Sequence, residues 1–350
     1  MKKIAIIGSG FFGVSAGLLL SKKNQIHIFE KENSILCGAS RANQMRFHMG
    51  YHYPRSIKTS KEILKHYKDF INFYGSNIFG NTKNYYAISK KNSKTSFSDY
   101  IKFLKKCDLS YKNQGSEFFS KNLSGSIEAN EKIINYFKFK KLISQKIKKN
   151  KNIKVFLKSN FKKELISNYD KIIISTYDQN NNVLKNLGLK PKKKFKYELI
   201  EKIIVKLPKK YCNKSFMVLD GKFVCLDPYL GTKYHLLSDN QNSKIEVIRD
   251  IFPNFKNSAK TLVNKMPQKI NTKTRFNKFI SKGKKFLPFL TDAKYIGSFF
   301  ITRVIEIGKE KTDERTSKIT KINNKVFTVF SGKWNTSVGI SKILVKILDD

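Results

Sequence analysis

One short run, GSGFFG, restricts the fold of this 350-residue chain more than any other feature. Its glycines, Gly8, Gly10 and Gly13, have the spacing GxGxxG and follow the apolar residues 4–7. A continuous apolar run is typical of a strand that is buried on both faces of a parallel sheet. A helical pattern without proline follows over residues 12–20. Because strand, glycine turn and helix occur in this order, the sequence predicts a Rossmann-type unit rather than an isolated turn.

An acidic residue closes the next predicted strand. Residues 25–29 read QIHIF, and Glu30 follows them, 20 positions after Gly10. In a Rossmann-type unit this acid accepts hydrogen bonds from a ribose hydroxyl, while the helix N-terminus faces the pyrophosphate. The sequence therefore predicts a bound dinucleotide, although these features suit NAD and FAD equally.

The segment after Glu30 favours FAD. Residues 37–56 read CGASRANQMRFHMGYHYPRS, and they resemble a superfamily of FAD-dependent enzymes that includes D-amino-acid oxidase, glycerol-3-phosphate dehydrogenase and 2-hydroxyglutarate oxidase. In that superfamily a Gly/Ser-rich segment is followed by a run such as N-S-G-x-I-H-A-G-x-Y-Y. The matching residues here are Asn43, His48, Gly50 and Tyr53, whereas Gln44, Met45 and Arg46 stand where the pattern has smaller residues. This departure concerns the substrate rather than the fold.

The C-terminal part of the chain carries a second match. Residues 325–348 predict a strand, a glycine turn and an amphipathic helix, and SGKWNT at 331–336 resembles the G-G-K-L-T-T segment beside the flavin in the glycerol-phosphate branch. Backbone N–H groups at such a helix start stabilise negative charge on a reduced flavin. The resemblance thus rests on sequence motifs at both ends of the chain, whereas the middle matches only in its pattern of predicted helices and strands.

The resemblance implies an α/β fold in which a Rossmann-like FAD-binding domain carries an inserted antiparallel-sheet substrate domain. The FAD-binding domain is expected to comprise residues 1–75, 150–190 and 285–350, and the substrate domain residues 76–149 and 191–284. The residues expected to contact FAD are Gly8, Gly10, Phe12, Gly13, Glu30, Lys31, Ala39, Ser40, Arg41, Asn43, Ser175, Gly332, Lys333, Trp334, Asn335 and Thr336.

Period-two alternation over residues 197–247 supports the inserted sheet. Asp220-Gly221 lies between two alternating runs, which indicates a β-hairpin. Residues 295–308 are expected to add a further strand, and residues 130–149 a helix.

Another helix is predicted over residues 56–75. Thr59 and Glu62 have the spacing of a capping box, in which each side chain bonds a backbone N–H of the first turn. Gly75 is expected to end this helix, because glycine readily adopts the conformation that follows a helix.

Four residues are expected to act on a substrate. Arg303 corresponds to an arginine that binds the acid group of the substrate in many members of the superfamily, and a guanidinium binds a carboxylate through two parallel hydrogen bonds. The alternative is a surface arginine paired with Glu306. His48 is expected at the flavin as a base or hydrogen-bond donor, the alternative being a packed structural histidine. Tyr53 and Arg55 are expected to line the substrate pocket or to turn the chain.

These assignments imply an FAD-dependent oxidoreductase. We expect it to oxidise a CH–NH or CH–OH group of a small acidic metabolite by hydride transfer to flavin N5, with oxygen, a quinone or another molecule as the electron acceptor. Two alternatives stay open: an FAD-dependent non-redox sugar isomerase or mutase, and a flavin-binding protein whose partner is a polyanion such as RNA or lipid.

The chain is strongly basic, with 70 Lys and Arg residues against 26 Asp and Glu and a formal net charge of +44. Such a balance alone indicates nucleic acid or an anionic membrane as a partner. The lysines are spread along the whole chain among abundant Asn and Ile, however, as an A/T-rich genome encodes, and no nucleic-acid-binding motif is present. We therefore expect no specific nucleic acid partner and at most a peripheral membrane contact.

The four cysteines are far apart and form no CxxC pair. This spacing indicates neither a disulfide framework nor a metal site, and it suits a reducing compartment. No signal peptide is expected, because the apolar N-terminal run is broken by the glycine motif and is too short to span a membrane, and no run of 18 apolar residues occurs elsewhere. We therefore expect a cytoplasmic protein without a metal.

Overall fold

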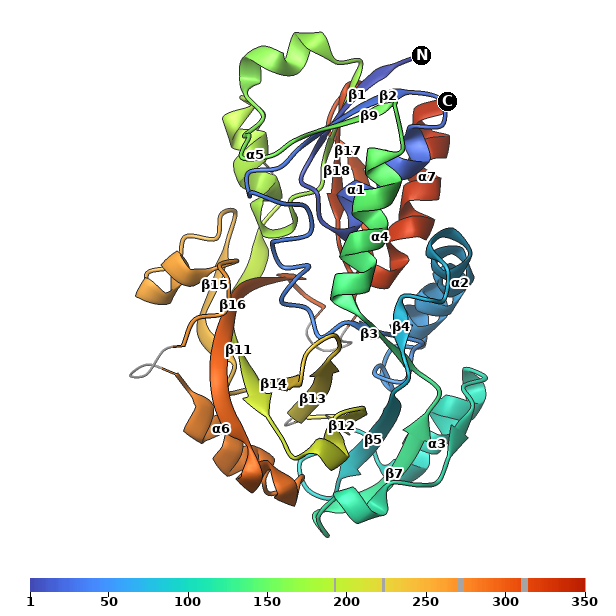
Figure 1. The fold of residues 1–350 in the computed structure, drawn as a ribbon, viewed down its shortest axis with the longest axis vertical. Coiled ribbons are helices and arrows are strands. Elements are labelled where there is room, and N and C mark those ends of the chain that lie inside the picture. The colour runs from blue at the N-terminus through green and yellow to red at the C-terminus, as the bar shows by residue number, and fades with distance from the viewer. Residues whose placement is uncertain (192, 222–223, 270–273, 310–313, 350) are drawn as a thin grey trace.

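Two β-sheets organise the chain, one above the other in Figure 1. The computed structural model describes residues 1–191, 193–221, 224–269, 274–309 and 314–349. The upper sheet has the strand order β17-β18-β10-β1-β2-β9. Its pairs are parallel except for β17 with β18. Its strands are β1 (Lys3–Ile7), β2 (Gln25–Phe29), β9 (Ile153–Phe156), β10 (Lys171–Ile174), β17 (Lys318–Lys321) and β18 (Val326–Phe330).

The lower sheet has nine strands and is mostly antiparallel. Its order is β15-β11-β14-β13-β12-β5-β7-β6, and β16 pairs with β11. Its strands are β5 (Lys83–Ser89), β6 (Tyr111–Lys112), β7 (Leu123–Ala129), β11 (Phe195–Lys206), β12 (Lys214–Leu219), β13 (Val224–Tyr229), β14 (Tyr234–Asp239), β15 (Lys244–Asp250) and β16 (Lys294–Glu306).

A small third sheet, β3-β8-β4, lies between them, formed by β3 (Arg46–Phe47), β4 (Phe79–Gly80) and β8 (Lys132–Ile134). Helices α1, α4 and α7 lie side by side against the parallel sheet (Figure 1), and buried residues of all three belong to one hydrophobic core. The helices are α1 (Phe11–Leu20), α2 (Ile57–Tyr74), α3 (Phe97–Lys106), α4 (Tyr136–Lys148), α5 (Asn180–Asn186), α6 (Phe276–Gly283) and α7 (Ser337–Asp349). Within the described residues, none of them is both long and apolar enough to cross a membrane.

The predicted fold class is confirmed. Strand β1, helix α1 and strand β2 form the expected parallel unit, in which Ile4 pairs with Ile26 and Ile6 with Ile28. The predicted hairpin is also present, since β12 and β13 flank Asp220 and pair in antiparallel register with Met217 opposite Cys225.

The chain returns to the parallel sheet later than the expected boundary at residue 285. Strand β16 pairs with β11 along its whole length, so it belongs to the large sheet. Conversely, α4 lies within the expected substrate segment 76–149 but buries Tyr136, Phe139 and Ile143 in the core that surrounds α1. Both differences come from contacts between segments far apart in the sequence: the pairing of β16 with β11, and the packing of α4 against the core around α1.

The predicted capping box of α2 is wrong. Ser56 caps this helix, and its side chain accepts the backbone N–H of Thr59. The carboxylate of Glu62 instead accepts the N–H of Ser317 at 3.2 Å. The N-cap is therefore Ser56 rather than Thr59, and the helix begins at Ile57. Gly75 ends it as predicted.

The single helix predicted over residues 130–149 is divided. Lys132–Ile134 form β8, which pairs with both β3 and β4. Asn135 then caps α4, since its side chain accepts the N–H groups of Phe137 and Lys138 at 3.1 Å. An asparagine that bonds the first backbone N–H groups is a strong helix start, which moves the helix to Tyr136.

Candidate cofactor and substrate site

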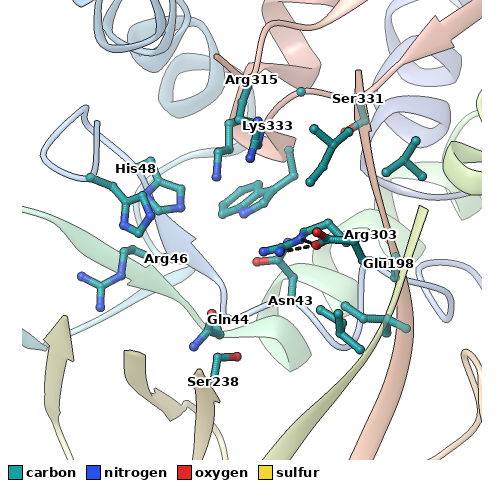
Figure 2. Close-up of a pocket in the computed structure, with 18 of the residues that line it drawn as sticks. Asn43, Gln44, Arg46, His48, Glu198, Ser238, Arg303, Arg315, Ser331 and Lys333 are labelled. Carbon is teal, nitrogen blue, oxygen red and sulfur yellow. Dashed lines mark hydrogen bonds and ion pairs between the residues drawn. The ribbon is translucent and has the colours of Figure 1, made fainter. Parts of the chain in front are cut away.

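A cavity of about 470 Å³ lies where the two sheets meet. One end is formed by Gly10 at the start of α1 and by Ser40, and the other by side chains of β11, β13 and β14. Figure 2 shows polar side chains from several elements around it, including His48, Arg303 and Lys333. The cavity therefore connects the glycine turn of the parallel unit with the face of the antiparallel sheet.

The glycine turn is closely packed at each of its three glycines. Gly8 has a φ of +98°, and a Cβ there would lie 2.6 Å from the carbonyl oxygen of Ser175. A Cβ on Gly13 would lie 1.9 Å from the carbonyl oxygen of Gly8. At Gly10 a Cβ would point at the Ser40 hydroxyl, 3.2 Å away, at the end of the cavity. Glycine is thus required for the turn and for helix packing, and at Gly10 it keeps the backbone open to a ligand.

Glu30 is held in one orientation at the end of β2. Its Oε2 accepts the backbone N–H of Ser9 at 3.0 Å and the Ser9 hydroxyl at 2.6 Å, and its Oε1 accepts the N–H of Glu32 at 3.0 Å. A carboxylate has about four acceptor sites, so it retains capacity for a ribose hydroxyl. The position and the fixed orientation both suit the expected ribose acid.

The SGKWNT segment fixes the other wall. The Trp334 ring stacks on Phe11 with centroids 4.7 Å apart, and the Asn335 amide donates to the carbonyl of His48 at 2.7 Å. The N–H of Gly332 donates to the Ser317 hydroxyl at 3.0 Å, so this donor is already engaged. The segment thus ties the start of α7 to the loop that carries His48.

These residues fit a flavin dinucleotide. Trp334 lines the cavity, and its buried Nε1 has no hydrogen-bond partner among the described residues, so one donor at the cavity wall lacks a protein partner. Buried polar atoms are rarely left in this way unless a ligand or water meets them. The glycine turn, Glu30 and this unpartnered donor thus suit the pyrophosphate, a ribose and the ring system of FAD.

The cavity brings together most of the residues predicted from the sequence. Its lining includes Gly10, Phe12, Ala39, Ser40, Asn43, His48, Tyr53, Arg55, Ser175, Arg303, Gly332, Lys333 and Trp334. The other predicted residues lie outside it: Gly8, Gly13, Glu30, Lys31, Arg41, Asn335 and Thr336. Arg41 in particular donates to the carbonyl of Asn264 at 2.8 Å, so its guanidinium is directed toward another segment.

Arg303 lies in the cavity and binds Glu198, not Glu306. Its Nε donates to Glu198 Oε2 at 2.6 Å, and its Nη2 donates to the same oxygen, as the dashed lines in Figure 2 show. Arg303 and Glu306 are three residues apart on β16, so their side chains leave opposite faces of the strand. Glu306 binds Lys318 at 2.8 Å instead.

Glu198 is surrounded by three cations. Besides Arg303, Lys196 and Lys244 lie 3.2 and 3.4 Å from its Oε1. Although burial opposes it, Arg303 and Lys244 hold the pKa of the Glu198 carboxyl below its usual range. The cluster of Lys196, Glu198, Lys244 and Arg303, here called the β11 charge cluster, therefore keeps a net positive charge at the cavity wall.

His48 and His52 are both buried beside the cavity, with ring centroids 5.5 Å apart. Burial lowers the pKa of His48 well below 6.5, and the positive charge of Lys333 lowers it further. The same two causes lower the pKa of His52. Both imidazoles are therefore neutral near pH 7. Nδ1 of His48 lies 3.9 Å from Glu131 Oε1.

Tyr53 and Arg55 differ in their contacts. Lys333 Nζ lies 4.8 Å from the centroid of the Tyr53 ring, a cation–π contact inside the cavity. Arg55 Nε donates to Asp220 Oδ2 at 2.8 Å, which joins the loop after β3 to the β12–β13 hairpin. Arg55 thus has a structural partner as well as a place in the cavity wall.

Several cavity residues were missed by the sequence analysis. On β11 the residues Lys196, Glu198 and Lys202 occupy alternate positions, so they lie on the same face and line the cavity. Charged residues at every second or fourth position, and hence on one face of a predicted strand, were a usable signal. Arg46 was noted only as a departure from the family pattern, yet its guanidinium is buried against Asp227 Oδ1 at 2.5 Å.

Comparison with known proteins gives a consistent result. Residues 3–115 match the family model described as FAD dependent oxidoreductase (DAO). Over 98 residues the chain is 31% identical to the FAD-dependent monooxygenase FPY4 of Fusarium mangiferae, which is 28% of this chain and 27% of that protein. The match thus spans about a quarter of that relative.

Solved structures share the whole fold at low sequence identity. Glycine oxidase from Geobacillus kaustophilus has a TM-score of 0.67 and 12% identity, covering 100% of this chain and 94% of that one. The L-alpha-glycerophosphate oxidase from Mycoplasma pneumoniae, solved with FAD bound, has a TM-score of 0.71 and 14% identity, covering 100% and 96%. L-proline dehydrogenase from P. horikoshii has a TM-score of 0.69 and 13% identity, covering 99% and 93%.

Proposed function

We propose that this chain, whose residues 3–115 match the DAO family model of FAD-dependent oxidoreductases, oxidises the CH–NH or CH–OH group of a small acidic metabolite. The observation that carries the proposal is the position of the cavity. It runs from the glycine turn, where a dinucleotide is bound in Rossmann-type units, to the positively charged face of β11 and β16. Bound FAD supplies the acceptor for a hydride from the substrate.

The chain's residues would hold the two ends of the cofactor. The N-terminus of α1 at Gly10 would meet the pyrophosphate, and Glu30 would accept from a ribose hydroxyl. Trp334 Nε1 would offer a hydrogen-bond donor to the ring system. The stacked rings of Trp334 and Phe11 exclude water from this part of the site.

The β11 charge cluster attracts the acid group of the substrate. Glu198 uses Nε and Nη2 of Arg303, whereas Nη1 has no hydrogen-bond partner among the described residues. Nη1 is therefore the group of Arg303 that binds the substrate carboxylate, and Glu198 fixes its direction. An anchored guanidinium orients a carboxylate better than a mobile one, because less side-chain entropy is lost on binding.

His48 moves the proton that leaves the substrate amine or hydroxyl. Glu131, 3.9 Å from Nδ1, favours the tautomer with a proton on Nδ1, so Nε2 is left to accept. The lowered pKa keeps the imidazole unprotonated at neutral pH, as a base requires.

The test begins with the purified protein. We expect a yellow protein whose released cofactor has the absorbance and mass of FAD, and whose flavin is reduced under anaerobic conditions by members of a panel of 2-amino and 2-hydroxy acids. The corresponding neutral amides are the matched controls and should reduce it far more slowly. A colourless protein that takes up NAD but cannot be reconstituted with FAD would overturn the proposal.

A further inference from the structure

A buried lysine on β11 forms no ion pair with the described residues. Lys202 is 9% exposed and lines the cavity, and no hydrogen bond or ion pair of its ammonium group is found among the described residues. A lysine is rarely buried so far unless an opposite charge meets it, because removing an ammonium group from water is costly. Burial, with a smaller contribution from Arg303, lowers the pKa of Lys202 to about 8 against the opposing effects of Cys225 and Asp227.

The carboxylates of the cavity wall are bound to other groups. Asp227 receives Arg46 at 2.5 Å and the Ser215 hydroxyl at 2.6 Å, and Asp239 receives Lys282 at 2.8 Å. Asp220 binds Arg55, and Glu198 is held by the β11 charge cluster. The charge of Lys202 is therefore left for a ligand that enters the cavity.

Polar groups next to Lys202 suit an anion. Ile203 pairs with Leu237, so the antiparallel register brings Lys202 beside Ser238 on the same face of the sheet. Ser238 Oγ is buried, lines the cavity and has no hydrogen-bond partner among the described residues. Gln44 also faces the cavity here (Figure 2), and its amide donates to Cys225 Sγ at 3.0 Å.

Lys202 and Arg303 lie at separate places on the cavity wall. Arg303 is opposite Glu198 in the β11–β16 ladder, and Phe299 is opposite Lys202. Four residues along a strand correspond to about 13 Å between Cα atoms. Ile200 and Ile301 pair with each other between these two positions, and both line the cavity. A small apolar chain with an acid group at each end fits this order of contacts.

We propose that Lys202, together with the hydroxyl of Ser238, forms a second anion subsite, and that the substrate is a small amino or hydroxy dicarboxylate. The inference rests on the proposed function for the first acid group, which Arg303 binds. The second carboxylate accepts hydrogen bonds from the Lys202 ammonium and from Ser238 Oγ. The subsite therefore selects dicarboxylates over monocarboxylates of the same length.

The test compares succinate with butyrate, which have the same number of carbons but differ in one carboxylate. Calorimetry on the flavin-loaded protein should give an affinity for succinate greater by roughly tenfold to a hundredfold, the range of a charge-assisted hydrogen bond. Lys202→Met should remove this preference while butyrate binding stays unchanged. Lys206→Met is the matched control, because Lys206 is an exposed lysine on the same strand outside the cavity.

A second measurement needs no variant. In the wild type the succinate preference should decline above about pH 8. Lys202 of the unliganded protein is then increasingly a neutral amine, which attracts a carboxylate less than an ammonium group does. The groups that face it are Cys225 and Asp227 on β13, Ser238 on β14 and Arg303 on β16. Butyrate binding should not show this decline at Lys202.

Equal affinity for succinate and butyrate in the wild type, or a preference that survives Lys202→Met, would overturn the subsite. Either result leaves the proposed oxidation of an acid untouched if the flavin is still reduced by monocarboxylic substrates. A protein that cannot hold FAD would overturn the proposed function instead, and the same calorimetry on the cofactor-free protein would then test the subsite by itself.

Discussion

Arg303 and Glu198 face each other across the β11–β16 ladder, and the arginine donates from Nε to the buried carboxylate at 2.6 Å. Glu198 is completely buried, so this contact is sheltered from solvent. The pair fixes the position of Arg303, which the sequence analysis had already associated with an acidic substrate. Because Nε and Nη2 bind Glu198, Nη1 is the part of the guanidinium that is left for a substrate.

Replacing Arg303 by alanine should lower kcat/KM for the acidic substrate by roughly tenfold to a hundredfold, since a charge-assisted pair contributes ~1.5–3 kcal/mol. Arg303→Lys should recover only part of this, because an ammonium keeps the charge but not the planar geometry. The flavin content should stay normal in both variants. Full activity of the alanine variant would show that Arg303 acts only as the partner of Glu198.

Glu198 should contribute stability that disappears in acid. Its folded-state pKa lies below the unfolded value, so this stability is present above about pH 4.5 and is lost as the pH falls through the folded pKa. In Glu198→Gln the difference between the free energies of unfolding at pH 7 and pH 4 should be smaller than in the wild type, as measured by urea titration. Glu117→Gln, on an exposed side chain outside the β11 charge cluster, should leave that difference unchanged.

His48→Gln should lower kcat by roughly a hundredfold to ten-thousandfold if the imidazole takes the substrate proton. In the wild type the acid limb of kcat/KM should lie below pH 6.5, because burial depresses the pKa of His48 and the unprotonated form is the active one. The variant should lack that limb. His27→Gln is the control, since His27 lies on β2 outside the cavity, and a His48 variant with wild-type rates would identify a packing histidine.

Gly10→Asp should prevent FAD binding, because a carboxylate would stand at the N-terminus of α1 where the pyrophosphate is expected. Gly10→Ala adds only a methyl group, 3.2 Å from the Ser40 hydroxyl, and should weaken binding far less. The measurement is the ratio of flavin to protein absorbance, with circular dichroism to verify the fold. If both variants retain FAD equally, the pyrophosphate is not at this turn.

Arg46→Met should destabilise the protein by about 3–5 kcal/mol, because it leaves the buried carboxylates of Asp227 and Glu131 without their cation. Adding Asp227→Asn to that variant should recover part of the loss. Lys23→Met removes the exposed ion pair with Asp349 and should change stability by less than about 1 kcal/mol. Urea unfolding of the four proteins distinguishes these cases, and a small loss for Arg46→Met would mean that water enters the cluster.

The sequence alone determined the parallel unit and its chemistry. The GSGFFG spacing and the position of Glu30 could be interpreted from the sequence, because a glycine turn, a helix start and a strand end are formed by residues close together in the chain. The α2 cap shows the limit even of local patterns, since Glu62 found a partner in Ser317, far away in the sequence.

The tertiary structure decided which charges meet. Glu306 is close to Arg303 in the chain, but its side chain leaves the opposite face of β16, and the register of β11 against β16 places Glu198 opposite Arg303. Lys202 lies in the cavity without an ion pair among the described residues, because Asp227, the carboxylate that acts on it, is engaged by Arg46. Strand register depends on side-chain packing across the whole sheet and not on any one segment, so the sequence could name the cations but not assign their partners.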